Sequence, residues 1–406
     1  MPERSSRQKW RVAYLVSHPI QYQAPMLRQI AAQPDIDLTV LFQSDLSLGP
    51  YADRGFGHTL RWDVPLLEGY RYEFLPGLWR HGPVTAQRPV SWGFARRLRR
   101  RNFDALWVHG YARCVNWAAM LCAKASGLKV LLRDEATAFS AERSRFRRQA
   151  KRLFFRSLSG IVDGFLAIGS ANRSYYLAHG IAAERIFSMP YCVDNEFFAE
   201  RARAAAPSRE ERRRALDLDP GRPVVLYASK FEARKRPDEL LRAYEHLVPQ
   251  SRAEARPYLL FVGDGALRAG LEAEARAKGL SDVRFLGFRN QTELPALYDL
   301  CDAFVLPSTS EPWGLVVNEV MAVGRPIVVS DRVGCARDLV RTGINGFVYP
   351  AGDARALADA LGEILRDRDR AARMGLQSRS ILAGWSFAED IAGLRAALAA
   401  TLGPEA

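Results

Sequence analysis

Short apolar runs alternate with longer amphipathic segments in both halves of the 406-residue chain. Brief runs rich in Val, Leu and Phe are typical of buried strands, and apolar residues recur at helical spacing over 238–247, 266–278 and 354–365. Strands joined by helical crossovers are parallel, and helices cover both of their faces. The alternation therefore predicts the α/β class, with two Rossmann-like doubly wound domains that face a cleft. The expected strands are 12–16, 38–42, 105–108, 130–132 and 164–168 in the first half, and 224–227, 258–262, 283–285, 303–306 and 327–329 in the second.

A charged, Ala-rich and strand-poor stretch separates the two halves. Such composition is typical of a domain linker, which we expect at 199–222. The first domain is then expected over 1–198 and the second over 223–384. The segment near 385–406 can pack back on the first domain.

Composition excludes several classes of protein. Hydrophobic residues make up 48% of the chain and charged residues 25%, which is typical of a globular protein with a sizeable core. The five cysteines are scattered and lack metal-ligand spacing, which argues against a disulfide framework and against structural zinc. No apolar run is long enough for a membrane span, and the first residues lack the apolar core of a signal peptide. We expect a cytoplasmic protein that is soluble or bound to a surface.

The net charge is +13, and nearly all of the positive excess lies in residues 1–200. This half should therefore meet an anionic partner, such as nucleic acid, an anionic membrane or an acidic substrate. No helix-turn-helix, RRM, KH or finger pattern accompanies the basic residues, so we expect no nucleic-acid partner.

Two basic segments, 94–101 and 141–158, allow two interpretations. Each combines arginines with apolar residues at helical spacing, and in the second segment the predicted apolar stripe is Phe146, Ala150, Leu153, Phe154 and Leu158. The stripe can pack on the protein's own sheet, which leaves an ordinary basic surface. Alternatively, the two segments hold the protein peripherally on the inner, anionic face of the cell membrane.

Two strand-end loops of the second half carry groups suited to phosphate. Lys230 and Lys235 follow the first strand, where two ammonium groups suit a diphosphate, although a basic turn is often only solvated. Gly263 and Gly265 follow the next strand in a Gly-Asp-Gly turn. This turn resembles a phosphate loop, but a lone GxG is a weak signal.

Two glutamates occupy a third strand-end loop and the helix after it, in the stretch "SEPWGLVVNE". Glu311 precedes the helix and Glu319 lies inside it, among apolar residues, while Gly314 allows backbone N–H groups to approach a phosphate. In one interpretation Glu311 favours the helix N-terminus and Glu319 points to water. In the other, both carboxylates accept hydrogen bonds from sugar hydroxyls, as acidic residues do for ribose in dinucleotide folds. Cations, exposed backbone and hydroxyl acceptors together suit a nucleotide-sugar.

Several motifs of the second half resemble GT-B glycosyltransferases, specifically the large retaining family 4. They are "SKFEARKRPDELLRAY", "LLFVGDGALRAGLEAEA", "VRFLGFRNQTELPALYDLCDAFVLPSTSEPWGLVVNEVMAVGRPIVVSD" and "RTGINGFVYPAGDARALADAL", in the family's order and spacing. The stretch "SEPWGLVVNE" fits the family's E-x7-E signature. In the first half, "RVAYLVSHPIQYQAPMLRQIA" and "PYCVDNEFF" are also similar to members of this family.

The resemblance implies roles for residues of the second half. Glu319 would hold the donor ribose, Glu311 would lie near the donor sugar, and Lys230 and Lys235 would neutralise the leaving diphosphate. Lys230 is a departure, because family members more often have arginine there. The other donor-binding residues implied are Gly263, Gly265, Phe288, Arg289, Trp313, Gly314, Leu315 and Val316, with Phe288 and Arg289 at the nucleobase and backbone contacts from Trp313 to Val316.

The first half departs further from the family pattern. It lacks the Gly-Gly turn after the first strand, and "VLLRDEATAFS" stands where many members have a histidine. We expect His18 and Arg133 to take part in catalysis. The further candidates for acceptor binding are Gln21, Tyr22, His109, Asp134 and Glu135.

The resemblance implies a retaining glycosyltransferase that uses a nucleotide-diphosphate sugar, in the assembly of a cell-surface polysaccharide or glycolipid. Residues 1–198 would bind a carbohydrate or lipid-linked acceptor, and residues 223–384 the donor. No cofactor and no divalent metal are expected, because lysines supply the positive charge at the diphosphate. Other GT-B enzymes, of the nucleotide-sugar epimerase or phosphorylase type, stay open as alternatives.

Overall fold

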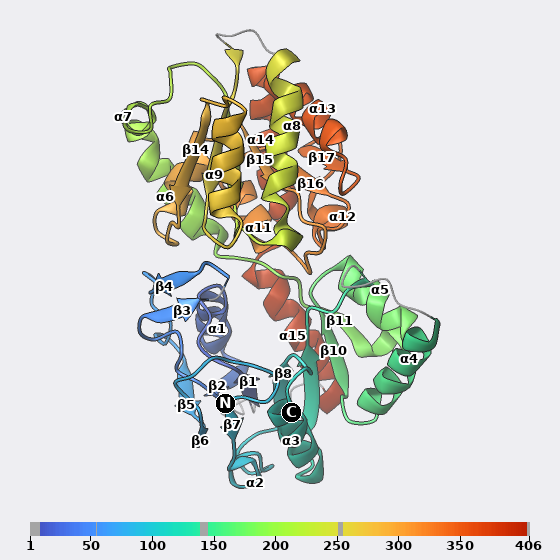
Figure 1. Cartoon of the computed structure of the whole chain (residues 1–406). Helices are drawn as coiled ribbons and strands as arrows, with labels where there is room; N and C mark the ends of the chain where they lie inside the picture. The colour runs from blue at the N-terminus through green and yellow to red at the C-terminus, as the bar shows by residue number, and fades with distance from the viewer. Residues whose placement is uncertain (1–8, 54, 139–144, 251–254, 404–406) are drawn as a thin grey trace, which may run out of the picture. The chain divides into compact units, whose positions relative to one another are not determined.

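The computed structural model describes residues 9–53, 55–138, 145–250 and 255–403, which form two compact units (Figure 1). The first unit comprises Met1–Tyr51, Val64–Val193 and Phe387–Ala406. The second comprises Ala52–Asp63 and Asp194–Ser386. No helix among the described residues is both long and apolar enough to cross a membrane.

The first unit is built on a seven-stranded parallel sheet of order β11-β10-β9-β8-β1-β2-β5. Its strands are β1 (Trp10–Val16), β2 (Ile36–Phe42), β5 (Arg71–Phe74), β8 (Ala105–His109), β9 (Lys129–Arg133), β10 (Gly164–Ala167) and β11 (Ile186–Ser188). Its helices are α1 (Gln23–Ala31), α2 (Phe94–Arg97), α3 (Cys114–Ala125), α4 (Arg145–Ser159), α5 (Ser170–Ala178) and α15 (Phe387–Leu402). The 3₁₀ turn η2 (Ala183–Arg185) and the short pair β6 (Gly77–Leu78) and β7 (Val90–Ser91) complete it.

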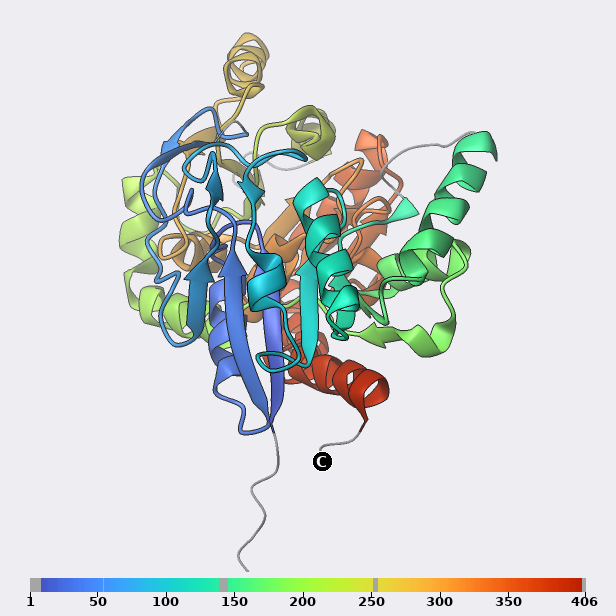
Figure 2. The same ribbon diagram turned by 90° about the horizontal axis from the view of Figure 1, so that it is seen from below.

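Helices cover both faces of this sheet because alternate strand residues point to opposite sides. One core joins Leu15, Leu106 and Val130 to residues of α2, α3, α4 and α5. The other joins Tyr14 and Trp107 to residues of α1 and α15. The C-terminal helix α15, drawn in red, lies beside these strands in Figure 2. The final helix of the chain therefore belongs to the unit that the first half of the chain builds.

The second unit is built on a six-stranded parallel sheet of order β14-β13-β12-β15-β16-β17. Its strands are β12 (Val224–Ala228), β13 (Tyr258–Val262), β14 (Val283–Gly287), β15 (Ala303–Leu306), β16 (Ile327–Ser330) and β17 (Gly346–Tyr349). Its helices are α6 (Asn195–Ala205), α7 (Arg209–Ala215), α8 (Pro237–Leu247), α9 (Arg268–Ala277), α10 (Leu294–Leu300), α11 (Leu315–Val323), α12 (Ala336–Leu339), α13 (Ala354–Leu365) and α14 (Arg368–Leu382). Three 3₁₀ turns, η3 (Ala206–Ser208), η4 (Ala233–Lys235) and η5 (Val248–Gln250), lie between them.

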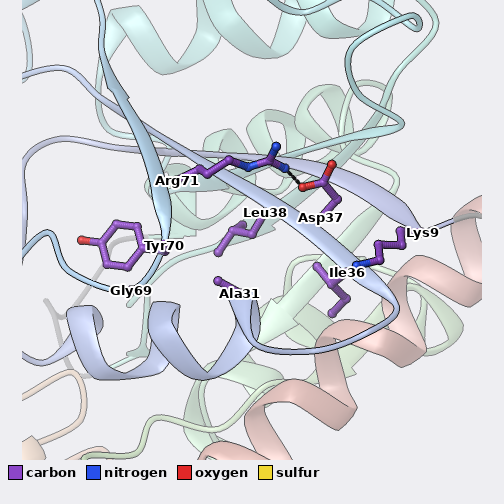
Figure 3. A pocket seen from close by; sticks show the side chains of 8 residues that line it. All are labelled: Lys9, Ala31, Ile36, Asp37, Leu38, Gly69, Tyr70 and Arg71. Atoms are coloured by element: carbon purple, nitrogen blue, oxygen red, sulfur yellow. Dashed lines mark ion pairs between the residues drawn. The ribbon is translucent and has the colours of Figure 1, made fainter.

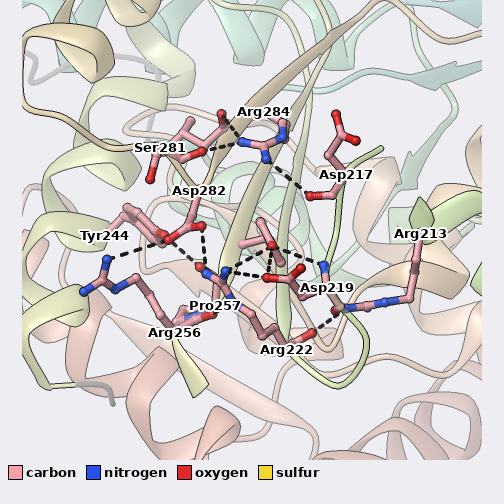
Figure 4. A network of polar contacts seen from close by, with 12 residues as sticks. Arg213, Asp217, Asp219, Arg222, Tyr244, Arg256, Pro257, Ser281, Asp282 and Arg284 are labelled. Carbon is pink, nitrogen blue, oxygen red and sulfur yellow. Dashed lines mark hydrogen bonds and ion pairs between the residues drawn. The ribbon is translucent and has the colours of Figure 1, made fainter. Parts of the chain in front are cut away.

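One face of this sheet packs on α8, α9 and α13 through a continuous apolar core. Across the sheet from that core, α6, α10 and α11 pack against one another. At the amino ends of β12, β13 and β14, a polar network ties the strands together (Figure 4). In it the Arg222 guanidinium bonds Asp219 at 3.1 Å and Asp282 at 2.8 Å, and it covers the Tyr258 ring at 4.0 Å. This charged cluster lies at the strand ends away from the candidate site.

The strands expected from the sequence are all present, with bounds that differ by at most a few residues. The boundary between the units differs from the expected one. Residues 199–222, expected to be a linker, lie largely in α6 and α7, and α6 packs on α10 and α11. The chain passes from the first unit to the second between Val193 and Asp194. Apolar residues of α6, such as Phe198 and Ala202, are buried, and this is why the stretch is not a solvated linker.

The basic segments bury fewer apolar residues than the sequence suggested. In α4, Phe155 and Leu158 are fully buried, whereas Leu153, a member of the expected stripe, is 66% exposed. Phe146 lies outside the residues whose side chains are described, as does the stretch 139–144. In the other segment Phe94 and Leu98 are buried, so the arginines face solvent while the apolar residues face the core.

Candidate functional site

Three loops of the second unit meet at the carboxyl ends of β12, β13 and β15. The strand order reverses between β12 and β15, and ligands of doubly wound sheets bind outside such a switch point. Backbone hydrogen bonds lace the loops together: Phe231 N–H donates to the Asp264 carbonyl at 2.8 Å, and Thr309 N–H donates to the Arg234 carbonyl at 2.9 Å. The sequence-predicted donor residues of these loops are therefore brought to one place.

Glycine is required in the turn after β13 because two loops come very close there. Gly263 has φ +127°, and a Cβ at this position would lie 2.0 Å from the Ser229 carbonyl oxygen. Gly265 has φ +148°, and its Cβ would lie 2.8 Å from the Phe231 carbonyl oxygen. These glycines let the β12 and β13 loops pack backbone to backbone, so the Gly-Asp-Gly turn forms part of the site's wall.

The N-terminus of α11 points its first-turn N–H groups toward the same region. Gly314, in the left-handed conformation at φ 99°, is the N-cap and offers no side chain to bond the N–H groups of Leu315 and Val316. Such a terminus attracts anions through its N–H groups and helix dipole. The Trp313 side chain is 2% exposed, and its indole donates to Asn318 at 2.9 Å. The Trp313 indole is therefore not available to a ligand.

Glu311 and Lys235 form a buried ion pair at this site. Lys235 is 9% exposed and Glu311 is 8% exposed, and the Lys235 ammonium donates to the Glu311 carboxylate. Arg234 approaches the same carboxylate at 3.5 Å. The left-handed Arg236 ends η4 and begins α8, and this conformation turns the Lys235 region toward β15. The sequence analysis placed Lys235 at the diphosphate; in the structure its ammonium already has a carboxylate partner.

Lys230 also has a carboxylate partner. Its ammonium lies 2.7 Å from an oxygen of Asp53, which belongs to the segment Ala52–Asp63 of the same unit. The Lys230 side chain is 30% exposed, whereas the Lys235 side chain is 11% exposed. Lys230 is therefore the more accessible of the two predicted cations.

Glu319 lies on the wall of a cavity of about 150 Å³. The Tyr298 hydroxyl donates to its carboxylate at 2.6 Å. Burial raises the pKa of Glu319 to about 7, although the hydrogen bond from Tyr298 partly opposes this. The carboxylate thus faces the cavity with one oxygen already occupied. The cavity is lined by Phe56, Ala228, Ser229, Val262, Gly263, Phe288, Arg289, Leu294, Tyr298, Val316 and Glu319.

In the first unit, His18 and His109 lie at the carboxyl ends of β1 and β8. His18 Nδ1 lies 2.8 Å from the Ser17 hydroxyl, and burial together with Arg113 lowers the pKa of His18 to about 4. Burial, reinforced by Arg133 and Arg113, lowers the pKa of His109 to about 3. Both rings are therefore neutral near pH 7.

Arg133 is held inside the first unit, away from any open position. It is 2% exposed, and its guanidinium bonds Asp390 of α15 at 2.8 Å and the Met189 carbonyl at 2.9 Å. It also covers the Tyr191 ring at 4.6 Å. This position does not favour the expected role of Arg133 in catalysis. A guanidinium with these partners instead anchors α15 to the sheet. Asp390 lies 257 positions from Arg133 along the chain, so no local sequence pattern links the two.

The remaining acceptor candidates join a polar cluster beside β9. Asp134 accepts hydrogen bonds from the Ala136 N–H at 2.6 Å and the Tyr176 hydroxyl at 2.8 Å, and burial raises its pKa to about 6. The Tyr191 hydroxyl donates to Glu135 at 2.7 Å. The Tyr22 ring lies edge-on to that of Tyr191, with ring centres 6.0 Å apart. Gln21 is half-buried in the loop just before α1.

Sequence reasoning missed four residues that the structure places at these sites. They are Asp53, Phe56, Arg113 and Tyr298. Burial lowers the pKa of Arg113 to about 10, and its nearest described polar partner is the neutral amide of Gln43 at 3.2 Å. Tyr298 lies in a helix whose apolar spacing made it look like core. Asp53 and Phe56 lie in the stretch "YADRGFGHTLRWD". This stretch is dense in aromatic and charged residues but lacks helical or strand periodicity, and that density was the only indication of a role at the site.

Another cavity, of about 560 Å³, lies elsewhere in the first unit (Figure 3). Its lining residues Lys9, Ile36 and Arg71 lie at the amino ends of β1, β2 and β5. Ligands of parallel sheets bind at the carboxyl ends, and the Arg71–Asp37 ion pair already satisfies its strongest charges. Among the described residues, no group of three or more His, Cys, Asp or Glu is placed to hold a metal ion.

Comparisons with known proteins find related sequences for part of the chain. Residues 208–380 match the family described as Glycosyl transferases group 1. A D-inositol 3-phosphate glycosyltransferase of Nocardia farcinica is 34% identical over 229 residues, covering 55% of this chain and 49% of that protein. An alpha-D-kanosaminyltransferase of Streptomyces kanamyceticus is 32% identical over 195 residues, covering 48% of each. The chain thus spans about half the length of the curated relatives it matches.

A solved structure is similar over nearly the whole chain. HepE of Anabaena, in complex with UDP and glucose, matches 96% of this chain and 98% of its own with a TM-score of 0.68 and 19% identity. At this identity the likeness concerns the fold, which is the two-domain parallel-sheet fold of GT-B glycosyltransferases.

Proposed function

We propose that the protein is a glycosyltransferase that moves a sugar from a nucleotide-diphosphate sugar to an acceptor. The observation that carries this proposal is the site at the carboxyl ends of β12, β13 and β15. There a cavity-facing Glu319, an uncapped helix N-terminus at Gly314 and the ammonium of Lys230 belong to one unit. The match of residues 208–380 to Glycosyl transferases group 1 supports the same assignment.

Each part of the site would bind one part of the donor. The Glu319 carboxylate would accept hydrogen bonds from the ribose hydroxyls, with Phe288 and Arg289 at the nucleobase. The N–H groups of Leu315 and Val316 and the lysines would meet the diphosphate. As the bond between the anomeric carbon and the phosphate oxygen breaks, the diphosphate takes the electron pair, and these fixed positive groups stabilise its growing charge. The acceptor oxygen forms the new bond and loses its proton.

Transfer with retention of configuration, as in family 4, and without a divalent metal is the finer form of this proposal. The support for metal independence is that Lys230 and the N-terminus of α11 supply positive charge where a metal would otherwise be needed. We therefore expect full activity in EDTA. A strict requirement for Mg²⁺ or Mn²⁺ would contradict that part of the proposal and leave the transfer itself standing.

Titration calorimetry with UDP, GDP, ADP and their sugar conjugates tests the donor class directly. We expect one nucleoside diphosphate to bind, and its sugar conjugate to release that diphosphate faster when an acceptor is present. A GT-B epimerase would instead interconvert donor sugars with no acceptor. A phosphorylase would carry the absorbance of a lysine-bound pyridoxal group. Failure of all three nucleotides to bind the folded protein would overturn the proposal.

The acceptor is proposed to be carbohydrate or lipid-linked, on the inner face of the cell membrane and in the assembly of a cell-surface polysaccharide or glycolipid. The support is the exposed arginines of α2, α4 and the turn after α2, whose apolar neighbours Phe94, Leu98, Phe155 and Leu158 face the core. Such a surface binds anionic lipid by charge, at about 1 kcal/mol for each basic side chain.

Sedimentation with vesicles tests the membrane proposal. We expect binding that rises with the anionic lipid fraction, falls with salt and is lost when Arg96, Arg99, Arg152 and Arg156 are changed to glutamate. Four exposed arginines of the second unit, Arg276, Arg355, Arg366 and Arg373, changed in the same way give the matched control. An equal loss of vesicle binding in both variants would mean that only the net charge of the protein matters. Absence of binding at low salt would contradict the membrane proposal and favour a soluble acceptor.

A further inference from the structure

Residues 52–53 and 55–63, here called the donor-site strap, dock on the loops of the proposed donor site. The strap belongs to the second unit, although the 130 residues Val64–Val193 of the first unit separate it from Asp194–Ser386. It includes β4 (His58–Leu60) and the end of β3 (Tyr51–Asp53), which pair as a two-stranded ribbon. Its contacts include Lys230 and Phe288, which the family resemblance assigns to the donor.

At one end of the strap, the Asp53 carboxylate forms an ion pair with Lys230. The Lys230 ammonium donates to Asp53 Oδ1 at 2.7 Å, and the same oxygen accepts from the N–H groups of Gly55 at 2.8 Å and Phe56 at 3.1 Å. The side chain of Asp53 is only 15% exposed. Gly55 is so close that a Cβ there would lie 2.5 Å from Lys230 Cδ. An anionic oxygen held by an ammonium group is the arrangement that a donor phosphate would require.

In the middle of the strap, Phe56 closes the cavity beside Glu319. Its ring packs against Phe288 with centroids 4.8 Å apart and planes at 73°, and the Lys230 ammonium lies 4.7 Å from the same ring. The His58 ring also packs on Phe288, with centroids 5.4 Å apart. With Phe56 lining it, the cavity holds about 150 Å³, less than the roughly 300 Å³ at which ligand pockets begin. A nucleoside therefore requires Phe56 to move.

At its far end the strap is tied to the loop after β14. Asn290 Nδ2 donates to the Arg61 carbonyl at 2.6 Å, and the Thr292 N–H donates to Asp63 Oδ2 at 3.1 Å. These bonds lie beyond Phe288, so they hold the strap in place without occupying Lys230. The anchored end and the site-filling end can therefore be altered separately.

We propose that the strap is an internal competitor for the donor, in which Asp53 takes the diphosphate position on Lys230 and Phe56 fills the nucleobase side of the cavity. The inference rests on the proposed function, because it names what the donor must displace. Donor binding replaces the Asp53 carboxylate on Lys230 with a phosphate. The affinity for the donor therefore depends on how much more strongly Lys230 binds the phosphate than the carboxylate. The strap then favours ligands that bring negative charge to Lys230, such as a nucleoside diphosphate. A free nucleoside brings no such charge and competes only with Phe56.

The variant Asp53→Asn tests this competition because it removes the charge and keeps the size. By calorimetry we expect UDP to bind this variant about fivefold more tightly than the wild type, the scale of a partly exposed ion pair. Uridine, which lacks the phosphates, should bind both proteins equally. Asp37→Asn is the matched control, since Asp37 pairs with Arg71 in the first unit and its loss should leave UDP affinity unchanged.

Hydrogen exchange gives a second readout that does not depend on a substitution. Saturating UDP should speed exchange of the Gly55 and Phe56 amides, since both now bond Asp53. Slower exchange would mean that the strap closes on the ligand, and it would overturn the proposal. So would unchanged or weaker UDP binding by folded Asp53→Asn, because Asp53 would then orient Lys230 for the donor. Failure of wild-type protein to bind any of UDP, GDP and ADP is a different result, which contradicts the proposed function itself.

Discussion

Glu311 and Glu319 lie on the same loop–helix unit, yet their surroundings give them different properties. Glu311 accepts charge-assisted contacts from Lys235 and Arg234. Glu319 meets one neutral hydroxyl, that of Tyr298, and burial raises its pKa to about 7. Two residues of the same type therefore differ in their surroundings, because distant parts of the chain supply their neighbours.

The titration of Glu319 should control nucleoside binding. An ionised carboxylate accepts ribose hydroxyls better than a protonated one, so uridine affinity should rise as pH increases through about 7 and level off above it. Uridine is the right probe because phosphate groups themselves titrate near pH 6. Calorimetry across this range should give a flat, weaker profile for Glu319→Gln. An equal pH dependence in both proteins would place the titrating group elsewhere.

The same group should also affect stability, with a definite sign. Its pKa is raised in the folded state from an ordinary value of 4.5, so the protonated form is favoured by folding. The favourable contribution is present below pH 4.5 and is lost as pH rises through about 7. The unfolding temperature of the wild type should therefore fall relative to that of Glu319→Gln as the pH rises from 4.5 to about 7.

Lys230 and Lys235 should separate in their effects when each is changed to methionine. Lys235→Met leaves Glu311 buried with only Arg234 near, so the free energy of unfolding should fall by about 3 kcal/mol. Lys230→Met removes a partly exposed pair, so stability should change by less than about 1 kcal/mol. Its kcat should nevertheless fall by about 10²- to 10³-fold, as when one charge-stabilising donor is lost.

Denaturant unfolding and steady-state kinetics measure both quantities. The double variant Lys235→Met, Glu311→Leu should recover stability relative to Lys235→Met, because no unpaired carboxylate remains. Full activity in Lys230→Met would mean that Lys230 belongs to an ordinary solvated turn and does not act on the diphosphate.

The loop after β13 shows how one element's backbone shapes the site. Gly263→Ala places a Cβ 2.0 Å from the Ser229 carbonyl oxygen at a φ of +127°, so either the β12 loop or the β13 loop must shift. We expect lower stability, by about 1–3 kcal/mol, together with weaker donor binding.

Gly270→Ala is the matched control in the next helix, α9. A Cβ there meets nothing within 4 Å, and the glycine lies in a helix interior, so stability should rise by about 0.5–1 kcal/mol with donor binding unchanged. Thermal unfolding and calorimetry on the two variants give the comparison. Equal behaviour of both would show that the packing of the two loops does not shape the site.

Over the whole chain, the ion pair between Arg133 and Asp390 fastens the last helix to the unit built by the first half. Both side chains are almost fully buried, at 2% and 0% exposure. Removing one partner should cost about 3–5 kcal/mol, because the other charge stays buried without compensation. We expect Arg133→Met to lower the unfolding temperature strongly, and Arg133→Met with Asp390→Leu to recover most of the loss. Loss of activity in the stable double variant would restore the catalytic role that the sequence analysis considered.

The sequence by itself determined the elements: apolar runs, helical spacing and glycine positions act over a few residues, so ten strands, the turn at Gly263 and the helix start at Gly314 could be predicted. Tertiary structure alone decided which charges meet. Asp53 lies 177 positions from Lys230, Lys235 lies 76 from Glu311, and Arg133 lies 257 from Asp390. Local patterns cannot select such partners, because the choice depends on how packed sheets bring distant loops together, and burial then sets each group's charge.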